Sequence, residues 1–252
     1  MQALNLSAKK FAQEGYLVVR GLAPADLRAE IRGAVEAALN PLEGPAEFEA
    51  EVGYVGAPRN REAPGGDTPR RLLNAYSRDA VFKQWAGSAS VRDQLRDLMG
   101  VTSVAMSQCH HNCVMTKHPG FSSETLWHQD IRYWSFDKPE LVSVWLALGS
   151  ETADNGALWV IPGSHQLELD RGRLDAKLFL RSELPENRAL IDAAQVVELD
   201  AGDVLFFHCR LFHAARMNCT SAVKLSLVGT YHAADNAPIP GTRSAQYPSV
   251  SL

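Results

Sequence analysis

The chain has 252 residues, enough to bury roughly three quarters of its unfolded surface in one core, so it requires neither disulfides nor a partner to fold. Its 25 Lys and Arg residues against 29 Asp and Glu residues give a net charge of −4 without long runs of one sign. This balance argues against nucleic-acid binding and favours a small-molecule substrate. We expect a monomer or a homodimer.

The cysteines and the N-terminus indicate where the protein resides. Cysteines 109, 113, 209 and 219 form no CxxC pair, and MQALNLSAKKFAQEG lacks the apolar core of a signal peptide. No run approaches the roughly 18 apolar residues required to cross a bilayer. These features predict a cytoplasmic protein without a membrane partner.

The first hundred residues are expected to be mostly helical. Ser7 is placed to cap a short helix that ends at Gly15, and YLVVRGL is typical of a strand. Residues 25–39 repeat apolar side chains at helical spacing. Segment 41–70 is rich in proline, glycine and charge, which predicts a long loop that acts as a lid. Two helical stretches follow, to about Met99.

Beyond residue 100 the sequence changes to short apolar or alternating segments separated by turn residues. These predict an antiparallel sandwich or small barrel built from VTSVAMSQ, HNCVMT, ETLWHQDIRYW, LVSVWLAL, ALWVIPG, QVVELD, DVLFFH and KLSLVGTYH. The polar stretch at about 166–194 is expected to be an insertion. One domain, 1–252, is therefore predicted, with the helical part at 1–99 and the β core at 100–235.

The sequence WHQD at residues 127–130 sets His128 and Asp130 two positions apart. On a strand these two side chains project from one face, so both could aim at one metal ion while Gln129 faces away. A bare HxD is more often a surface histidine beside a turn. The metal interpretation therefore depends on a third ligand.

A second histidine would complete the two-histidine, one-carboxylate site typical of non-haem Fe(II). His208 and His213 are the candidates, and their five-residue spacing would point them to opposite faces of a continuous strand. The remaining histidines, at 110, 111, 118, 165 and 232, have no comparable spacing. CHHNC at 109–113 is a weak zinc candidate, because structural zinc sites usually pair cysteines as CxxC.

Five sequence blocks together resemble the phytanoyl-CoA hydroxylase family of Fe(II)- and 2-oxoglutarate-dependent dioxygenases. They are FAQEGYLVVRGL, KHPGF leading to LWHQD, NGALWVIPGSH, AGDVLFFH and LFHAARMN, in the family's order over about residues 11–232. The resemblance implies a mainly β fold with flanking N-terminal helices, a double-stranded β-helix or jelly-roll barrel. It also implies Fe(II), 2-oxoglutarate and dioxygen as cofactor and cosubstrates.

The resemblance also assigns the iron ligands. The family's distal histidine is followed five residues on by asparagine, which selects His213, with Asn218, over His208. The implied catalytic and metal residues are thus His128, Asp130 and His213. Because related halogenases replace the carboxylate with a small residue, the presence of Asp130 favours hydroxylation.

The expected cosubstrate site departs from the family pattern. The usual arginine for the far carboxylate of 2-oxoglutarate, eleven residues after the distal histidine, is here Lys224, and the serine two residues after that histidine is Ala215. Lysine lacks the planar fork of arginine, so Arg216 is an alternative cation. The other residues expected at the cosubstrate are Asn218, Thr116 and Gln108.

The substrate side is expected just after the metal aspartate. If the strand continued, Arg132 and Trp134 would return to the metal face and Tyr133 would turn away. A pocket bordered by an arginine and an indole favours a small or medium-sized polar or anionic metabolite. An ion pair of Arg132 with Glu47 or Glu49 explains this arginine equally well.

Three classes of function are compatible with these residues. An oxygenase that hydroxylates an unactivated C–H bond is the leading hypothesis. A non-catalytic cupin-like protein that binds a metal or small acid is the second, and Lys224 and Ala215 make it credible. A metalloenzyme without a redox step is the third.

Overall fold

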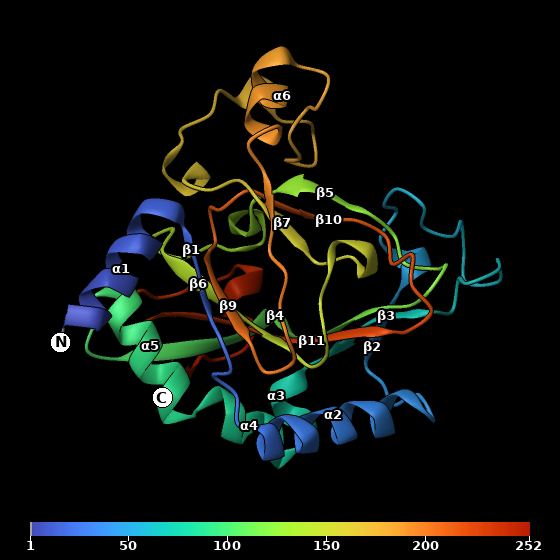
Figure 1. Cartoon of the computed structure of the whole chain (residues 1–252), viewed down its shortest axis with the longest axis horizontal. Coiled ribbons are helices and arrows are strands. Elements are labelled where there is room, and N and C mark those ends of the chain that lie inside the picture. The colour runs from blue at the N-terminus through green and yellow to red at the C-terminus, as the bar shows by residue number, and fades with distance from the viewer. Residues whose placement is uncertain (1) are drawn as a thin grey trace.

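The computed structural model describes residues 2–252, with side chains from Leu6 onward, and consists of two antiparallel sheets that face each other (Figure 1). The larger sheet has the order β1 (Tyr16–Val19), β9 (Val204–His208), β6 (Leu141–Ala147), β11 (Lys224–Ala233), β4 (Val104–Lys117), β3 (Pro69–Leu73) and β2 (Ala46–Phe48), and β12 (Val250–Ser251) also pairs with β4. The smaller sheet has the order β5 (Thr125–His128), β10 (His213–Ala215), β7 (Leu158–Val160) and β8 (Gln195–Val196). This is the expected jelly roll. Within the described chain no strand pair joins the two sheets, so it is an open sandwich rather than a closed barrel.

Helices cover the outer face of the larger sheet (Figure 1). They are α1 (Gln2–Glu14), α2 (Ala25–Leu39), α3 (Ala75–Arg78), α4 (Ala80–Ala86) and α5 (Ala89–Met99), while α6 (Pro185–Ile191) lies apart from them. The predicted bounds of α2 and the end of α5 are confirmed. The Ser7 cap was wrong, because α1 already begins at Gln2; Gly15 follows this helix with a φ of 81°.

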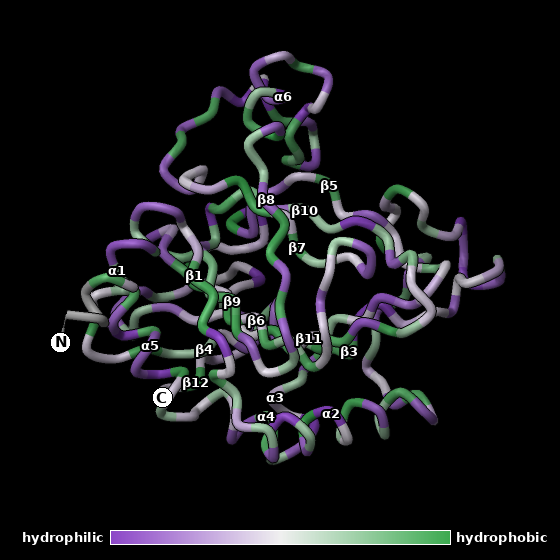
Figure 2. Tube along the Cα trace, in the orientation of Figure 1, coloured by the Kyte–Doolittle hydropathy of each residue, from purple (hydrophilic) through white to green (hydrophobic). Residues whose placement is uncertain are grey.

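Alternation along the central strands divides the core into two layers. In β6, Val144 and Leu146 pack toward the helices, whereas Trp145 and Ala147 pack between the sheets. Successive side chains of a strand point to opposite faces, so a strand buried on both faces is apolar throughout. Figure 2 accordingly shows the central strands as hydrophobic and the outer helices as mixed.

The strands differ from the predicted ones at three places that shape the site. The two segments VTSVAMSQ and HNCVMT form the single strand β4, with an irregular register opposite Gly229 and Thr230. The strand predicted to run to Trp134 ends at His128, and residues Asp130–Tyr133 form a 3₁₀ turn, η2. The strand β10, not among the predicted strands, pairs with β5 and β7.

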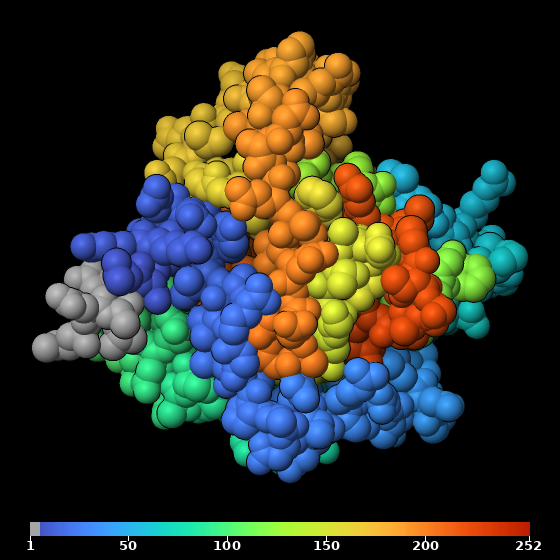
Figure 3. Space-filling model, viewed as in Figure 1, coloured from blue at the N-terminus to red at the C-terminus, as the bar shows by residue number. Residues whose placement is uncertain are grey.

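Two long connections lie beside the sheets. Segment 41–70 is not a structureless loop, because it contains β2 and the 3₁₀ turn Glu49–Glu51, and it also bridges Val55 to Glu124. Insertion 166–194 carries α6 and stands above the smaller sheet (Figure 1), and its atoms project from the rest of the molecule (Figure 3). The N-terminal part also adds β1, β2 and β3 to the larger sheet, so it is less purely helical than predicted. Among the described residues no helix is both long and apolar enough to cross a membrane.

Candidate metal centre

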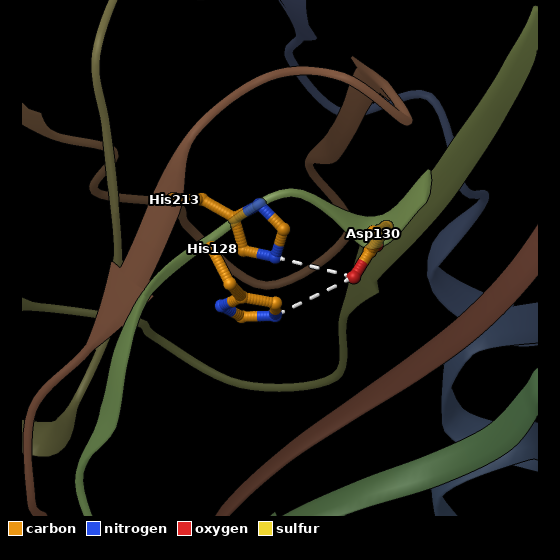
Figure 4. A group of neighbouring side chains, drawn as sticks. All are labelled: His128, Asp130 and His213. Carbon is orange, nitrogen blue, oxygen red and sulfur yellow. Dashed lines mark ion pairs between the residues drawn. The ribbon is translucent and has the colours of Figure 1, made fainter. Parts of the chain in front are cut away.

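Three buried side chains meet between the sheets: His128 at the end of β5, His213 at the start of β10, and Asp130 at the start of η2. The two histidines are direct cross-strand partners. Asp130 Oδ1 lies 3.6 Å from His128 Nε2 and 3.5 Å from His213 Nε2 (Figure 4). Two ligands at a right angle on one metal lie about 3 Å apart, given bonds of about 2.1 Å. The three groups could therefore hold one metal ion.

Backbone carbonyls orient both imidazole rings. His128 Nδ1 lies 2.8 Å from the Leu126 carbonyl oxygen, and His213 Nδ1 lies 3.0 Å from that of Leu211. A carbonyl only accepts a hydrogen bond, so each Nδ1 carries a proton, and in the neutral ring Nε2 is then the unprotonated nitrogen. The Nε2 lone pairs are left to face Asp130, which is the arrangement that metal-binding histidines require.

Asp130 is fully buried, and its oxygens have different surroundings. Oδ1 has no hydrogen-bond partner among the described residues. Oδ2 accepts a bond of 3.4 Å from Ser143 Oγ and lies 3.2 Å from His111 Nδ1. An orphaned buried carboxylate oxygen is costly unless a cation compensates it. A divalent cation such as Fe(II) fits this oxygen and the two facing imidazoles.

Electrostatics favour the ligand forms of Asp130 and His128. Burial alone would raise the pKa of Asp130, but the imidazoles of His111 and His213 hold it well below its usual range. Burial lowers the pKa of His128 to about 4. Burial also opposes the charged form of His213, yet the adjacent Asp130 carboxylate outweighs it and raises this pKa. Metal ligation requires an ionised carboxylate and neutral imidazoles.

A cavity of about 670 Å³, including its mouth, opens beside these three residues. Aromatic and aliphatic side chains form much of its wall, and four cationic side chains also line it: Arg70, Arg71, Lys117 and Lys224. Such a site, apolar with a few converging polar groups, is typical of small-molecule pockets.

Lys224, the cation expected at the far carboxylate of 2-oxoglutarate, lines the cavity, but it has an internal counter-ion. Its Nζ lies 2.9 Å from Glu151 Oε2, and both side chains are buried. Glu151 Oε1 also accepts bonds from Trp145 Nε1 at 2.9 Å and from Ser226 Oγ at 2.6 Å. The alternative cation, Arg216, is exposed, and its guanidinium stacks on Trp159 at 4.7 Å instead of facing the cavity.

Lys117, which the sequence analysis missed, is the direct cross-strand partner of Lys224. Its Nζ donates to the carbonyl oxygens of Ser123 at 3.0 Å and Arg216 at 2.7 Å. Burial, followed by the charges of nearby cations, lowers the pKa of Lys117 to about 7. The sequence signal that could have identified Lys117 as a site residue was its position at the end of the strand that also holds His111.

Two of the remaining residues expected at the cosubstrate do not line the cavity. Gln108 donates to the Pro248 carbonyl, because the irregular register of β4 turns it toward the C-terminal segment. Asn218 donates to the Lys117 and Ala222 carbonyls, so it orders the turn before β11. Thr116 lines the cavity, although its hydroxyl donates to the Pro69 carbonyl.

The parity argument for Arg132 and Trp134 was wrong, since the 3₁₀ turn replaces the strand after Asp130. Trp134 is buried in a separate cluster with Phe136 and does not line the cavity. Arg132 stacks on Phe179 at 4.2 Å, while Tyr133, expected to turn away, lines the cavity. Glu47 and Glu49 pair with Arg70 and Arg71 rather than with Arg132.

Both long connections contribute to the mouth of the cavity. Tyr54 of segment 41–70 lines the cavity, and its hydroxyl lies 3.4 Å from that of Tyr133. Phe179 of insertion 166–194 packs edge-on against Tyr54 and against His128, with ring centroids 5.9 and 5.7 Å away. The role of the insertion in covering the metal ligands was not apparent from the sequence.

The other histidine and cysteine candidates lie outside the three-residue group. His208 ends β9 in the larger sheet, and its ring faces His165 at 5.3 Å. Cys109 and Cys113 are buried free thiols. Over the described residues, His128, Asp130 and His213 form the one cluster suited to hold a metal ion.

Comparison with known proteins gives consistent matches along the chain. The sequence profile of the family described as phytanoyl-CoA dioxygenase (PhyH) matches residues 11–226. An ectoine dioxygenase of Sphingopyxis alaskensis is 26% identical over 246 residues, which cover 91% of this chain and 76% of the relative. The peroxisomal phytanoyl-CoA dioxygenase of Homo sapiens is 23% identical over 248 residues, covering 92% and 69%.

Solved structures share the fold. EctD from S. alaskensis, determined with 2-oxoglutarate and 5-hydroxyectoine, superposes with a TM-score of 0.75 at 23% identity, over 92% of this chain and 77% of that one. The epimerase SnoN from nogalamycin biosynthesis, in complex with Fe³⁺, α-ketoglutarate and nogalamycin RO, has a TM-score of 0.74 at 22% identity, over 96% and 91%. At these identities the likeness describes the fold alone.

Proposed function

This chain belongs to the phytanoyl-CoA dioxygenase (PhyH) family and is a non-haem iron, 2-oxoglutarate-dependent oxygenase, and we propose that it hydroxylates a C–H bond of a small or medium-sized polar metabolite. The observation that carries the proposal is the convergence of His128 Nε2, Asp130 Oδ1 and His213 Nε2 beside a largely apolar cavity. We assign these three residues as the iron ligands.

Different residues of the site have different roles in such a hydroxylation. Fe(II) with 2-oxoglutarate and dioxygen supplies the oxidant, while 2-oxoglutarate is converted to succinate and carbon dioxide. The Leu126 and Leu211 carbonyls hold the two imidazoles in the tautomer that binds metal. Tyr54 and Tyr133 line the cavity, and Phe179 packs against Tyr54 and His128; these three form an aromatic rim that excludes water from the reacting carbon.

We assign the far carboxylate of 2-oxoglutarate to the end of the cavity where Lys224 and Lys117 face each other across β11 and β4. Lys224 occupies the family's cation position, and Glu151 holds its ammonium in place. Because Glu151 compensates one positive charge, a second cation is needed to balance an incoming carboxylate. Lys117, whose Nζ donates only to backbone carbonyls among the described residues, supplies it, because a bound carboxylate raises the lowered pKa of this lysine and favours its charged form.

The first test is succinate formation by purified protein given Fe(II), 2-oxoglutarate and dioxygen without any substrate. We expect slow, iron-dependent succinate release, which a polar metabolite from a screened collection increases and converts into a hydroxylated product. A protein that binds 2-oxoglutarate but releases no succinate under any of these conditions would instead be a binding protein.

Segment 41–70 is proposed to act as a lid, because Tyr54 covers the cavity while much of the segment around it is exposed. Trypsin should cut at exposed Arg59 and Arg61 several-fold more slowly once Fe(II) and 2-oxoglutarate are bound without dioxygen. Cleavage at Lys10, in α1, serves as the control and should not change. Equal cutting of the segment in free and loaded protein would contradict the lid.

A further inference from the structure

One guanidinium at the wall of the cavity forms no hydrogen bond with the described residues. Arg71 lines the cavity, and its side chain is 15% exposed. Its Nε is buried without a hydrogen-bond partner among the described residues, and the nearest carboxylate oxygen, Glu47 Oε1, lies 3.4 Å away. Burial opposes the charged form, but Glu47 and the nearby Cys113, Tyr133 and Tyr54 together outweigh burial and raise the pKa of Arg71, so the side chain stays cationic.

The neighbouring Arg70 is different, although it also lines the cavity. Arg70 donates to Ser123 Oγ at 2.9 Å and to Thr125 Oγ1 at 3.0 Å, and Glu49 lies 3.6 Å away. These contacts tie β3 to Ser123 and to the first residue of β5 through the two terminal nitrogens of Arg70, although its Nε, 3.5 Å from Glu47 Oε1, is unpaired among the described residues like that of Arg71. Within the described part of the chain the Arg71 side chain has an ion pair with Glu47 but no hydrogen bond, so its donors remain available to a bound molecule.

The position of Arg71 separates it from the lysines assigned to the cosubstrate. Arg71 pairs with Met115 on β4, whereas Lys117 and Lys224 form the cross-strand pair two residues further along that strand. Two residues along a strand correspond to about 6.7 Å. Arg71 also lies on the opposite side of β4 from β11. It thus borders the part of the cavity closer to Tyr54 and the mouth.

We propose that Arg71 binds a carboxylate of the substrate, so that the substrate of this oxygenase is a carboxylic acid. The inference rests on the proposed function and names the substrate class. The planar fork of arginine matches a carboxylate through two parallel N–H···O bonds. Because Glu47 and Glu49 already compensate the charges of Arg70 and Arg71, a ligand here is held by directed hydrogen bonds rather than by net charge, and a dianionic phosphate would be less well balanced than a monoanion.

In this proposal Arg71, and not Arg132 as expected from the sequence, makes the polar contact with the substrate. Arg132 stacks on Phe179 and Tyr133, which places it behind the aromatic rim. The apolar walls beside Arg71, which include Met115 and Tyr54, suit the hydrocarbon part of an acid. The carboxylate would then fix which C–H bond faces the metal ligands.

The test uses pairs of carboxylates and their primary amides: butanoate and butanamide, hexanoate and hexanamide, L-proline and L-prolinamide, L-leucine and L-leucinamide. Binding is measured by calorimetry without dioxygen on protein loaded with Fe(II) and 2-oxoglutarate, and succinate release is measured with dioxygen. We expect at least one acid to bind ten-fold more tightly than its amide. That acid should stimulate succinate release, and its amide should not.

Arg71→Gln should reduce this preference to less than about three-fold and lower kcat/KM for the stimulating acid at least ten-fold, while the Kd of 2-oxoglutarate changes less than three-fold. The preference of Arg71→Lys for the acid should fall between those of the wild type and Arg71→Gln. Arg216→Gln, which removes an exposed arginine outside the cavity, should match the wild type.

A panel in which no acid binds better than its amide would overturn the inference, as would an undiminished preference in Arg71→Gln. An equal loss of 2-oxoglutarate affinity would reassign Arg71 to the cosubstrate. Failure of the proposed function is distinct, because it would appear as wild-type protein that forms no succinate at all.

Discussion

Replacing His213 with alanine is expected to lower Fe(II) affinity by more than about 100-fold and to abolish succinate formation, because partners outside the ligand set of a metal already contribute about 10- to 100-fold. His128→Ala and Asp130→Ala should have the same effect, since their ligand atoms and that of His213 lie within 4.8 Å of one another. Metal affinity is measured anaerobically by calorimetry, and turnover by succinate release.

His208→Ala is the matched control for this series. His208 ends a strand of the larger sheet, and its ring faces His165 outside the cavity, so metal affinity and turnover should stay near the wild-type values. The ligand assignment would be wrong if His208→Ala lost both properties while His213→Ala kept them. Circular dichroism of each variant checks that the fold is retained.

Glu151→Gln is expected to strengthen 2-oxoglutarate binding about ten-fold, because it removes the negative charge that compensates Lys224. Without its counter-ion the ammonium is buried and unpaired, so the ligand-free variant should have a lower Tm. Bound 2-oxoglutarate supplies a replacement carboxylate, and the increase in Tm on binding should therefore exceed that of the wild type.

Lys224→Met should act in the opposite direction on affinity. The Kd of 2-oxoglutarate should rise at least ten-fold, and the free energy of unfolding should fall by about 3–5 kcal/mol, because Glu151 becomes a buried unpaired charge. The double variant Glu151→Gln/Lys224→Met removes both charges, so it should recover much of the Tm but not the affinity. An unchanged Kd in folded Lys224→Met would show that this lysine serves stability alone.

The approach of His128 and Asp130 could be predicted from two-residue spacing, although the strand ends earlier than expected. Gln129 keeps an extended backbone, with φ −112° and ψ 137°, so the alternation continues through it and its side chain turns to the Arg210 carbonyl. The 3₁₀ turn then ends the alternation. This local change is why the same argument failed for Arg132 and Trp134.

The choice between His208 and His213 depended on where the chain changes sheets. Their five-residue spacing left both open, because a periodic pattern does not show that β9 ends at His208 and that β10 begins in the other sheet at His213. The family resemblance selected His213 through Asn218. The structure places Asn218 in the turn before β11 rather than in the cavity. Asn218 therefore identified His213 by its spacing along the chain and not by a contact in the site.

The sequence by itself determined an antiparallel β core, the helical N-terminal segments, and the spacing that brings a histidine and an aspartate together, because strand alternation and helical periodicity are local properties of the chain. The jelly roll itself was implied by the family resemblance. Only the tertiary structure decided the charge balance of the cavity. Glu151 and Lys224 are 73 positions apart, and Arg71 reaches the cavity only through the pairing of β3 with β4. The strength of a charge depends on burial and on its nearest partner. Both are set by packing between distant segments, and no local pattern records them.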